Sequence, residues 1–438
     1  MIRPMATNPI PQFPAGFLWG VSTSAHQIEG AADLRAPSVW DAFTAEPGRV
    51  KDGSTAAVAC DHYHRYREDV ALLADLGVDA YRFSVSWPRV DSPGGLDFYD
   101  RLVDELCAAG IRPVATLFHW DLPVGLDWLR RETAERFAQY TATVAARLGD
   151  RVGTWLTLNE PAEHTLLGHA LGAHAPGRQL LFDALPAAHH QLLGHGLAVR
   201  ALRAAGATDI GIANSHGPTW PASHAAEDLE AAAFYDILLN RLFADPLLLG
   251  RYPEGIDALM PGDVEADLKV IAEPIDRYGV NYYAPTRVGA PQGDEIEFGG
   301  LTLPAELPFS VREIEDRPVT DFGWPVVPEG LTELLTGLRD RYGDRLPPVV
   351  ITENGCSYPG LDDQDRIGYL DGHIRALHDA LAAGVDVRGY FVWSLLDNFE
   401  WAEGYARRFG LVHVDFATLE RTPKTSYGWF REVLRAQR

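Results

Sequence analysis

Residues 66–87 read YREDVALLADLGVDAYRFSVSW and contain the alternation that decides the fold. The first half predicts a helix with one apolar face, formed by Val70, Leu72, Leu73 and Leu76. Gly77 then stands where a helix is expected to stop. The second half is rich in β-branched and aromatic residues and predicts a buried strand. A helix that leads through a short turn into a strand is typical of parallel α/β proteins.

The same alternation of strand-like and helix-like sequence occurs eight times along the chain. The predicted strands span residues 17–22, 80–87, 113–119, 154–159, 210–215, 278–283, 349–353 and 389–394. Because the composition shows no break, we predict one α/β domain over residues 1–438, a single (β/α)8 TIM barrel. Its active site is expected at the C-terminal ends of the strands. An open doubly wound sheet is the structural alternative.

Two segments depart from the alternation. Residues 1–14 are expected to form an N-terminal extension, and they lack the basic and apolar regions of a signal peptide. Residues 284–328 are rich in Pro, Gly and acidic residues and are expected to form a long loop after strand six. Such a loop would open on the catalytic face of the barrel.

Composition narrows the function classes. The chain has 438 residues, 46% hydrophobic content and a formal net charge of −23, so nucleic acid is not an expected partner. No apolar run is long enough for a membrane span, and a cytoplasmic protein is expected, with a homo-oligomer left open. Three cysteines are too few for a disulfide framework or a zinc site.

Polar and aromatic residues that do not suit a buried strand gather at the predicted strand ends. They are Gln27, Arg82, His119, Trp120, Asn159, Glu160, Asn281, Tyr283, Glu353, Trp393, Glu400 and Trp401. In a barrel the C-terminal strand ends converge on one pit, so these residues are expected to meet there although they are far apart in sequence.

Glu160 and Glu353 are the candidate catalytic pair. Two carboxylates across a pit can cleave an acetal when one protonates the leaving oxygen and the other attacks or activates water. Close spacing means retention of configuration and wider spacing means inversion, and the sequence leaves both open. Arg82 and Tyr283 are expected to keep Glu353 ionised, whereas Glu160 has no cation beside it in the sequence.

The same strand ends supply groups that suit a sugar. The indoles of Trp120, Trp393 and Trp401 can pack on pyranose rings, while hydrogen-bonding side chains beside them can bind hydroxyls. We therefore expect a small glycoside as the partner. No metal and no cofactor are expected, because the strand ends offer aromatics and amides rather than a cluster of metal ligands.

The residues at the strand ends also lie in motifs that resemble family 1 of the glycoside hydrolases, the β-glucosidase family. Eight motifs match in order: FLWGVSTSAHQIEG from residue 17, CDHYHRYREDVALLADLG from 60, YRFSVSWPR from 81, LFHWDLP from 117, TLNEP from 157, NYY from 281, ITENG from 351 and GYFVWSLLDNFEWAEGYARRFGL from 389. The match covers essentially the whole chain.

The resemblance implies a retaining, exo-acting β-glucosidase with possible β-galactosidase or β-fucosidase side activity. Glu160 of TLNEP would be the acid/base and Glu353 of ITENG the nucleophile, supported by Arg82 and Tyr283. The residues implied to bind the terminal sugar or to line its surroundings are Gln27, His119, Trp120, Asn159, Asn281, Trp393, Glu400, Trp401 and Phe409. Trp324 is expected to line the leaving-group subsite.

Two rival functions and one departure accompany the resemblance. A 6-phospho-β-glycosidase is disfavoured by Glu400, and an inactive sugar-binding barrel is disfavoured because both carboxylates are present. TLNEP is usually followed by a bulky aromatic residue, but Ala162 follows here. That change would either widen the leaving-group side or alter packing.

Overall fold

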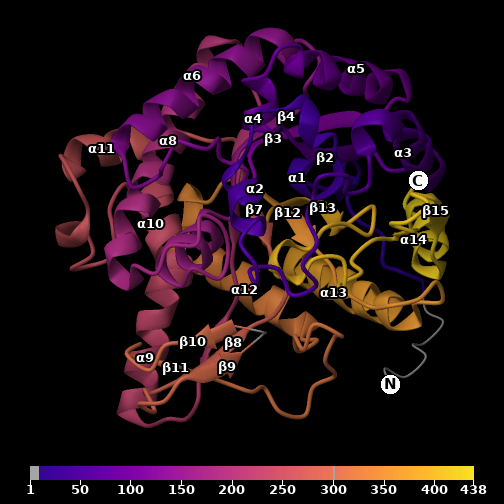
Figure 1. Cartoon of the computed structure of the whole chain (residues 1–438). Coiled ribbons are helices and arrows are strands. Elements are labelled where there is room, and N and C mark those ends of the chain that lie inside the picture. Colours follow the sequence, from indigo (N-terminus) through magenta and orange to yellow (C-terminus); the bar gives the residue numbers. More distant parts are fainter. Residues whose placement is uncertain (1–8, 299–300) are drawn as a thin grey trace.

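The computed structural model describes residues 9–298 and 301–438. Its centre is a closed barrel of eight parallel strands in the order β1-β13-β12-β7-β5-β4-β3-β2 (Figure 1). The strands are β1 (Leu18–Ser22), β2 (Ala80–Ser84), β3 (Arg112–Phe118), β4 (Thr154–Asn159), β5 (Ile210–Ser215), β7 (Arg277–Asn281), β12 (Val349–Asn354) and β13 (Val387–Trp393). Because β1 pairs with both β2 and β13, the sheet closes. The predicted TIM barrel is confirmed, and the open sheet is excluded.

All eight predicted strands are present, with small differences at their ends. The clearest difference concerns residues 80–87, where β2 ends at Ser84. Trp87 instead begins the short helix α4 (Trp87–Val90), whose second residue is Pro88. Proline is favoured in the first turn of a helix because it has no N–H to leave unpaired.

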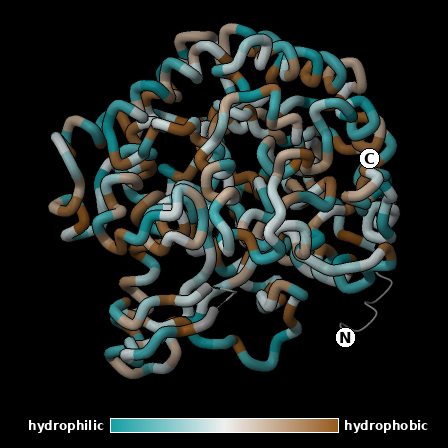
Figure 2. Tube along the Cα trace, viewed as in Figure 1, coloured by the Kyte–Doolittle hydropathy of each residue, from teal (hydrophilic) through white to brown (hydrophobic). Residues whose placement is uncertain are grey.

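Helices surround the barrel (Figure 1). They are α1 (Ala25–Ile28), α2 (Val39–Thr44), α3 (His62–Leu76), α4, α5 (Gly95–Ala108), α6 (Arg131–Leu148), α7 (Pro161–Glu163), α8 (Leu185–Ala204), α9 (Ala226–Asp236), α10 (Leu242–Leu249), α11 (Val264–Ile271), α12 (Pro328–Tyr342), α13 (Gln364–Ala382) and α14 (Thr425–Ala436). Hydrophobic and hydrophilic residues alternate along the outer helices (Figure 2), as expected for helices with one buried face. In the described parts of the chain, no helix is both long and apolar enough to cross a membrane.

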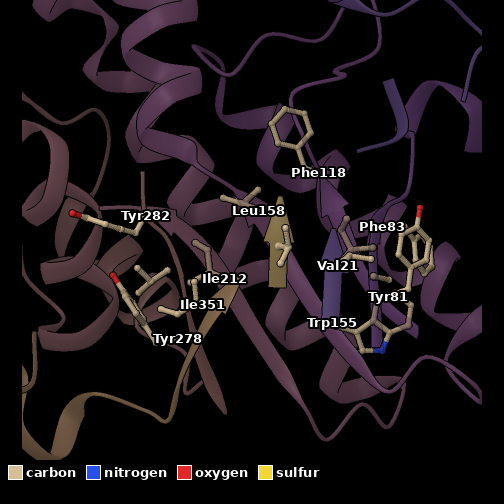
Figure 3. Close-up of a cluster of buried hydrophobic side chains, with 14 of the residues drawn as sticks. Val21, Tyr81, Phe83, Phe118, Trp155, Leu158, Ile212, Tyr278, Tyr282 and Ile351 are labelled. Carbon is tan, nitrogen blue, oxygen red and sulfur yellow. The ribbon is translucent and has the colours of Figure 1, made fainter. Parts of the chain in front are cut away.

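The barrel strands bury apolar side chains on both faces. Outward-facing residues such as Val21, Tyr81 and Ile351 belong to the large core between strands and helices (Figure 3). A second cluster takes one residue from each of six strands, so it fills the barrel interior: Ala80, Val114, Leu156, Ala213, Val350 and Phe391. Side chains two residues further along a strand point to the same face, which places functional residues above this apolar plug.

The segment 284–328 differs from the expected loop. It follows β7 and precedes α12, but it contains four short strands, β8 (Thr286–Gly289), β9 (Ile296–Phe298), β10 (Leu301–Leu303) and β11 (Ser310–Arg312). β8 pairs with β11 and with β6 (Thr219–Pro221), and α9 lies beside them at the lower left of Figure 1. Strands of three or four residues are too short to show a period in the sequence, which explains the wrong expectation of a structureless loop.

The predicted extension, 1–14, lies partly outside the described residues, which begin at position 9. The remaining part is packed rather than free. Phe13 is buried, and its ring centroid lies 4.6 Å from that of Phe17 and 5.0 Å from that of Trp19. Ile10 and Phe13 therefore belong to the barrel core, whereas Gln12 and Pro14 are exposed.

Candidate active site

A cavity of about 560 Å³ opens at the C-terminal ends of the barrel strands. Ten of the residues predicted from the sequence line it: His119, Trp120, Glu160, Tyr283, Trp324, Glu353, Trp393, Glu400, Trp401 and Phe409. Gln27, Arg82, Asn159 and Asn281 lie directly behind this lining, and each is fully buried. The barrel thus gathers all fourteen predicted site residues around one pit.

Glu353 faces the pit because β12 is irregular. The pairing of β12 with β7 shifts register between Ile351 and Glu353. Strict alternation would place Glu353 on the same outward face as Ile351, and the irregularity re-aims it inward. Its carboxylate accepts hydrogen bonds from Arg82 Nη1 at 2.5 Å and from the Tyr283 hydroxyl at 2.8 Å.

Arg82 connects the nucleophile candidate to its surroundings. Its position two residues after Ala80 points it into the barrel. Besides Glu353, it donates to the Thr352 carbonyl at 3.0 Å and to Asn159 Oδ1 at 2.6 Å. With these partners the guanidinium is held in one orientation, as a buried charge requires.

Glu160 sits at the sharp exit from β4. Its backbone is left-handed, with φ 44° and ψ 62°, and Pro161 begins α7 directly after it. The Glu160 N–H still donates to the Ala213 carbonyl at 2.7 Å, so the strand ladder fixes its position. Its Oε1 accepts from Asn281 Nδ2 at 2.9 Å.

The two carboxyl groups have different electrostatic surroundings. Burial raises the pKa of Glu160 well above its usual range, and the negative charges of Glu353 and Glu163 raise it further. Burial also raises the pKa of Glu353, but there Arg82 and Tyr283 act in the opposite direction. Arg82 and Tyr283 therefore favour the carboxylate form of Glu353, whereas the surroundings of Glu160 favour its protonated form.

Aromatic rings form one wall of the pit. The His119 ring lies between two indoles, with centroids 5.8 Å from Trp393 and 5.9 Å from Trp401. Trp120 in turn lies 4.7 Å from Trp401. This layer offers the flat apolar surface on which a pyranose ring can pack.

His119 also has a defined hydrogen-bonding role. Asn159 accepts through its oxygen from Arg82 and Asn281, so its amide nitrogen donates to His119 Nε2, at 3.0 Å. The proton of the neutral ring then lies on Nδ1, which has no partner among the described residues. Burial lowers the pKa of His119 well below its usual range, so the ring stays neutral.

Glu400 and Gln27 form a second polar contact. Gln27 Nε2 donates to Glu400 Oε2 at 3.3 Å and to the Phe399 carbonyl at 3.0 Å. Desolvation, followed by the charge of Glu353, raises the pKa of Glu400 to about 8. Direct contact of Gln27, Asn159 and Asn281 with a sugar stays a prediction, because all three lie behind the lining.

Trp324 and Phe409 are neighbours in the cavity wall. The Trp324 ring lies 5.3 Å from Tyr283 and 4.4 Å from Phe322, with which it stacks, and its distance to Phe409 is 6.0 Å. Trp324 is thus joined through Tyr283 to the surroundings of Glu353.

Sequence reasoning missed residues beside the acid/base candidate. Glu163 lines the cavity and accepts from the Ser215 hydroxyl at 3.0 Å. Its spacing of three residues from Glu160, on one helical turn, was a usable signal. Ala162 is 2% exposed and packs in the main core rather than lining the cavity.

Within the described residues, no group of three or more His, Cys, Asp or Glu side chains is arranged to hold a metal ion. The site instead contains two carboxyl groups with different electrostatic surroundings beside a group of aromatic rings. A closed parallel barrel with these groups at its mouth defines a barrel glycosidase.

Comparison with known proteins gives the family. The model for glycosyl hydrolase family 1 matches residues 10–438. β-Glucosidase A of Acetivibrio thermocellus is 43% identical, covering 97% of this chain and 98% of the relative. A bifunctional β-D-glucosidase/β-D-fucosidase of Bifidobacterium breve is 41% identical, covering 96% of this chain and 98% of the relative.

A solved structure agrees with these relatives. The crystal structure of a psychrophilic β-glucosidase from Micrococcus antarcticus has a TM-score of 0.93 and 44% identity, covering 99% of this chain and 100% of that one. The chain therefore belongs to glycosyl hydrolase family 1. The family predicted from the sequence motifs is confirmed.

Proposed function

We propose that the protein is a retaining, exo-acting β-glucosidase in which Glu353 is the nucleophile and Glu160 the acid/base. The observation that carries the assignment is the unequal support of the two groups. Arg82 and Tyr283 both bind Glu353, whereas the side chain of Glu160 accepts, among the described residues, a hydrogen bond from a neutral amide and lies near two other carboxyl groups. An ionised nucleophile and a protonated acid follow from this arrangement.

The spacing of the two carboxyl groups supports retention. Both carboxyl groups line one cavity, and the charge of Glu353 is among the causes that raise the pKa of Glu160, so the two groups are close enough to interact directly. Retaining glycosidases place the pair about 5 to 5.5 Å apart and inverting ones about 6.5 to 9.5 Å apart.

The reaction proceeds in two displacements. A Glu353 oxygen attacks the anomeric carbon while Glu160 gives its proton to the glycosidic oxygen, so the C–O bond breaks and the alcohol leaves. Glu160, now a carboxylate, takes a proton from water as that water attacks the same carbon and releases Glu353. After the first step Glu353 is an ester without charge, so the Glu160 pKa falls and suits its role as base.

The polar end of the pit suits an unphosphorylated terminal sugar. Glu400 holds a proton at neutral pH, since its pKa is about 8, so its charge is a weak barrier to a phosphate. A phosphate would, however, need a free cation, and the two cations of the cavity wall are paired, Arg49 with Glu46 and Lys51 with Glu403. Activity on β-fucosides is a second candidate, favoured by the bifunctional relative.

Two variants test the assignment together. Glu353→Gly should lose hydrolysis of aryl β-glucosides by several orders of magnitude, and added azide should restore turnover with α-glucosyl azide as the product. Glu160→Ala should lose little activity on substrates with good leaving groups and much on poor ones, because only poor leaving groups need a proton. A Glu353→Gly variant with unchanged hydrolysis, or equal losses across leaving groups for Glu160→Ala, would contradict the assignment.

A further inference from the structure

The cavity continues beyond the two carboxyl groups into an apolar passage. One wall comes from the π-helix His164–Ala170 and the residue after it, with Leu166, Leu167 and Leu171 facing the cavity. A second wall comes from the end of β10 and the segment that leads to β11, with Leu303, Leu307 and Phe309. We name these six residues the apolar passage. Its two walls come from segments more than 130 positions apart in the sequence.

The walls of the apolar passage are held in place by packing. Leu303 and Phe309 belong to a buried cluster of α9 and the short strands, and Leu171 and Leu307 pack against that cluster. The Tyr235 ring of α9 supports Phe309 at a centroid distance of 5.1 Å. The apolar passage is therefore built on the same small core that packs the segment 284–328 against α9.

Several polar groups of the cavity wall near the passage are hydrogen-bonded within the protein, as the Thr165 hydroxyl is to the Pro161 carbonyl at 2.7 Å. Glu163 and Ser215 both line the cavity beside Glu160 and are bonded to each other at 3.0 Å. A second sugar reaching into the passage would place its hydroxyl groups against leucine and phenylalanine side chains, and burial of unpaired polar groups is unfavourable. Apolar groups of the same size would instead gain from leaving water.

We propose that the natural substrate carries a large apolar alcohol as its leaving group, and that the apolar passage binds this aglycone. The terminal sugar fills the polar end, the glycosidic oxygen lies at Glu160, and the carbon skeleton of the alcohol extends between Leu171 and Leu307. The inference rests on the proposed β-glucosidase activity and names its substrate class. The passage should bind the leaving group rather than a separate ligand, because Glu160, Glu353 and the six residues of the passage line one cavity.

A series of alkyl β-glucosides tests the proposal. Methyl, butyl, hexyl and octyl β-glucosides have leaving alcohols of similar acidity from butyl onward, so differences in kcat/KM report contacts of the chain rather than leaving-group chemistry. Each methylene that enters the passage should raise kcat/KM by about two- to fourfold, as expected for burial of a CH₂ group. Octyl β-glucoside should also be a better substrate than cellobiose.

Matched substitutions locate the effect. Leu171→Asn and Leu307→Asn, one on each wall, should lower kcat/KM for octyl β-glucoside about fivefold or more and leave methyl β-glucoside within about twofold. Leu229→Asn is the control, because Leu229 lies on α9, is 45% exposed and is outside the cavity lining. It should change neither value. Retained methyl β-glucoside activity shows that each variant is folded.

The outcomes separate this inference from the proposed function. If aryl and methyl β-glucosides are hydrolysed but kcat/KM is flat from butyl to octyl, or cellobiose is preferred, the apolar aglycone is wrong and the β-glucosidase stands. If no β-glucoside is hydrolysed, the proposed function itself fails. If a wall variant does not fold, the alkyl series on the unmodified protein still decides.

Discussion

At the scale of single residues, three residues of the pit have a strained backbone. Trp120, Glu160 and Trp401 have positive φ values of 74°, 44° and 49°, although none is glycine. Such conformations cost about 1 to 3 kcal/mol each and persist where the surrounding structure imposes them. All three were identified as site residues from motifs alone, but their backbone geometry could not be predicted from sequence, because it depends on contacts such as the Glu160 N–H with Ala213.

The hydroxyl of Tyr283 should support Glu353. Tyr283→Phe removes one hydrogen bond to the charged form, so the pKa of Glu353 should rise and the acidic limb of the kcat/KM profile should move to higher pH. We expect kcat to fall about 10- to 100-fold, as for the loss of a hydrogen bond to a charged group. Tyr282→Phe is the control, because its hydroxyl binds the Val327 carbonyl. An acidic limb that shifts equally in both variants would refute the role of Tyr283.

Glu163 should influence the pH at which kcat/KM falls on the alkaline side. Its negative charge is one of the causes that raise the pKa of Glu160, so Glu163→Gln should lower that pKa. The acid form of Glu160 is then lost at lower pH, and the alkaline limb of the kcat/KM profile should move to lower pH. Glu265→Gln, an exposed residue paired with Lys269, is the matched control and should leave the limb in place. No movement in Glu163→Gln would show that Glu163 does not act on Glu160.

At the scale of the elements, sequence predicted strands well where the pattern was long. The strand 154–159 has the predicted bounds, and Pro161 marks its end as a chain breaker should. The inward turn of Glu353 was not predictable, because strict alternation points it the other way and the register shift in β12 depends on both neighbouring strands. The strands inside 284–328 were missed because each has only three or four residues.

The helix α2 should depend on its N-terminal cap. Ser38 accepts from the Asp41 N–H at 3.2 Å, and Asp41 accepts from the Ser38 N–H at 2.7 Å, which makes a capping box. Ser38→Ala should lower the free energy of unfolding by about 1 kcal/mol, measured as a lower denaturant midpoint at unchanged m. Ser38→Gly should cost less than alanine, since glycine is tolerated at caps.

The same helix connects the cap to the pit. Trp40 of α2 packs on Trp401 with centroids 4.5 Å apart.

Equal denaturant midpoints for Ser38→Ala and the unmodified protein would show that the cap does not stabilise this region. Activity of Ser38→Ala should fall only modestly at temperatures well below the unfolding transition.

At the scale of the whole molecule, the barrel explains why distant motifs work together. Parallel strands that close into a barrel direct all their C-terminal ends to one face, so the convergence of the fourteen predicted site residues followed from the fold prediction. The apolar passage did not follow from the fold prediction, because its residues lie in a π-helix, a three-residue strand and connecting segments outside the eightfold alternation. Their sequence carries no mark of what they face until the excursion 284–328 is folded against α9.

The central claim is that Glu353 and Glu160 act by double displacement with retention. The most direct test is ¹H NMR of the first sugar released from an aryl β-glucoside, recorded before the anomers equilibrate. The interaction of the two carboxyl groups across one cavity predicts β-glucose as the first product, followed by slow mutarotation to the α anomer. Initial release of α-glucose would mean inversion and would contradict both the covalent intermediate and the role of Glu353 as nucleophile.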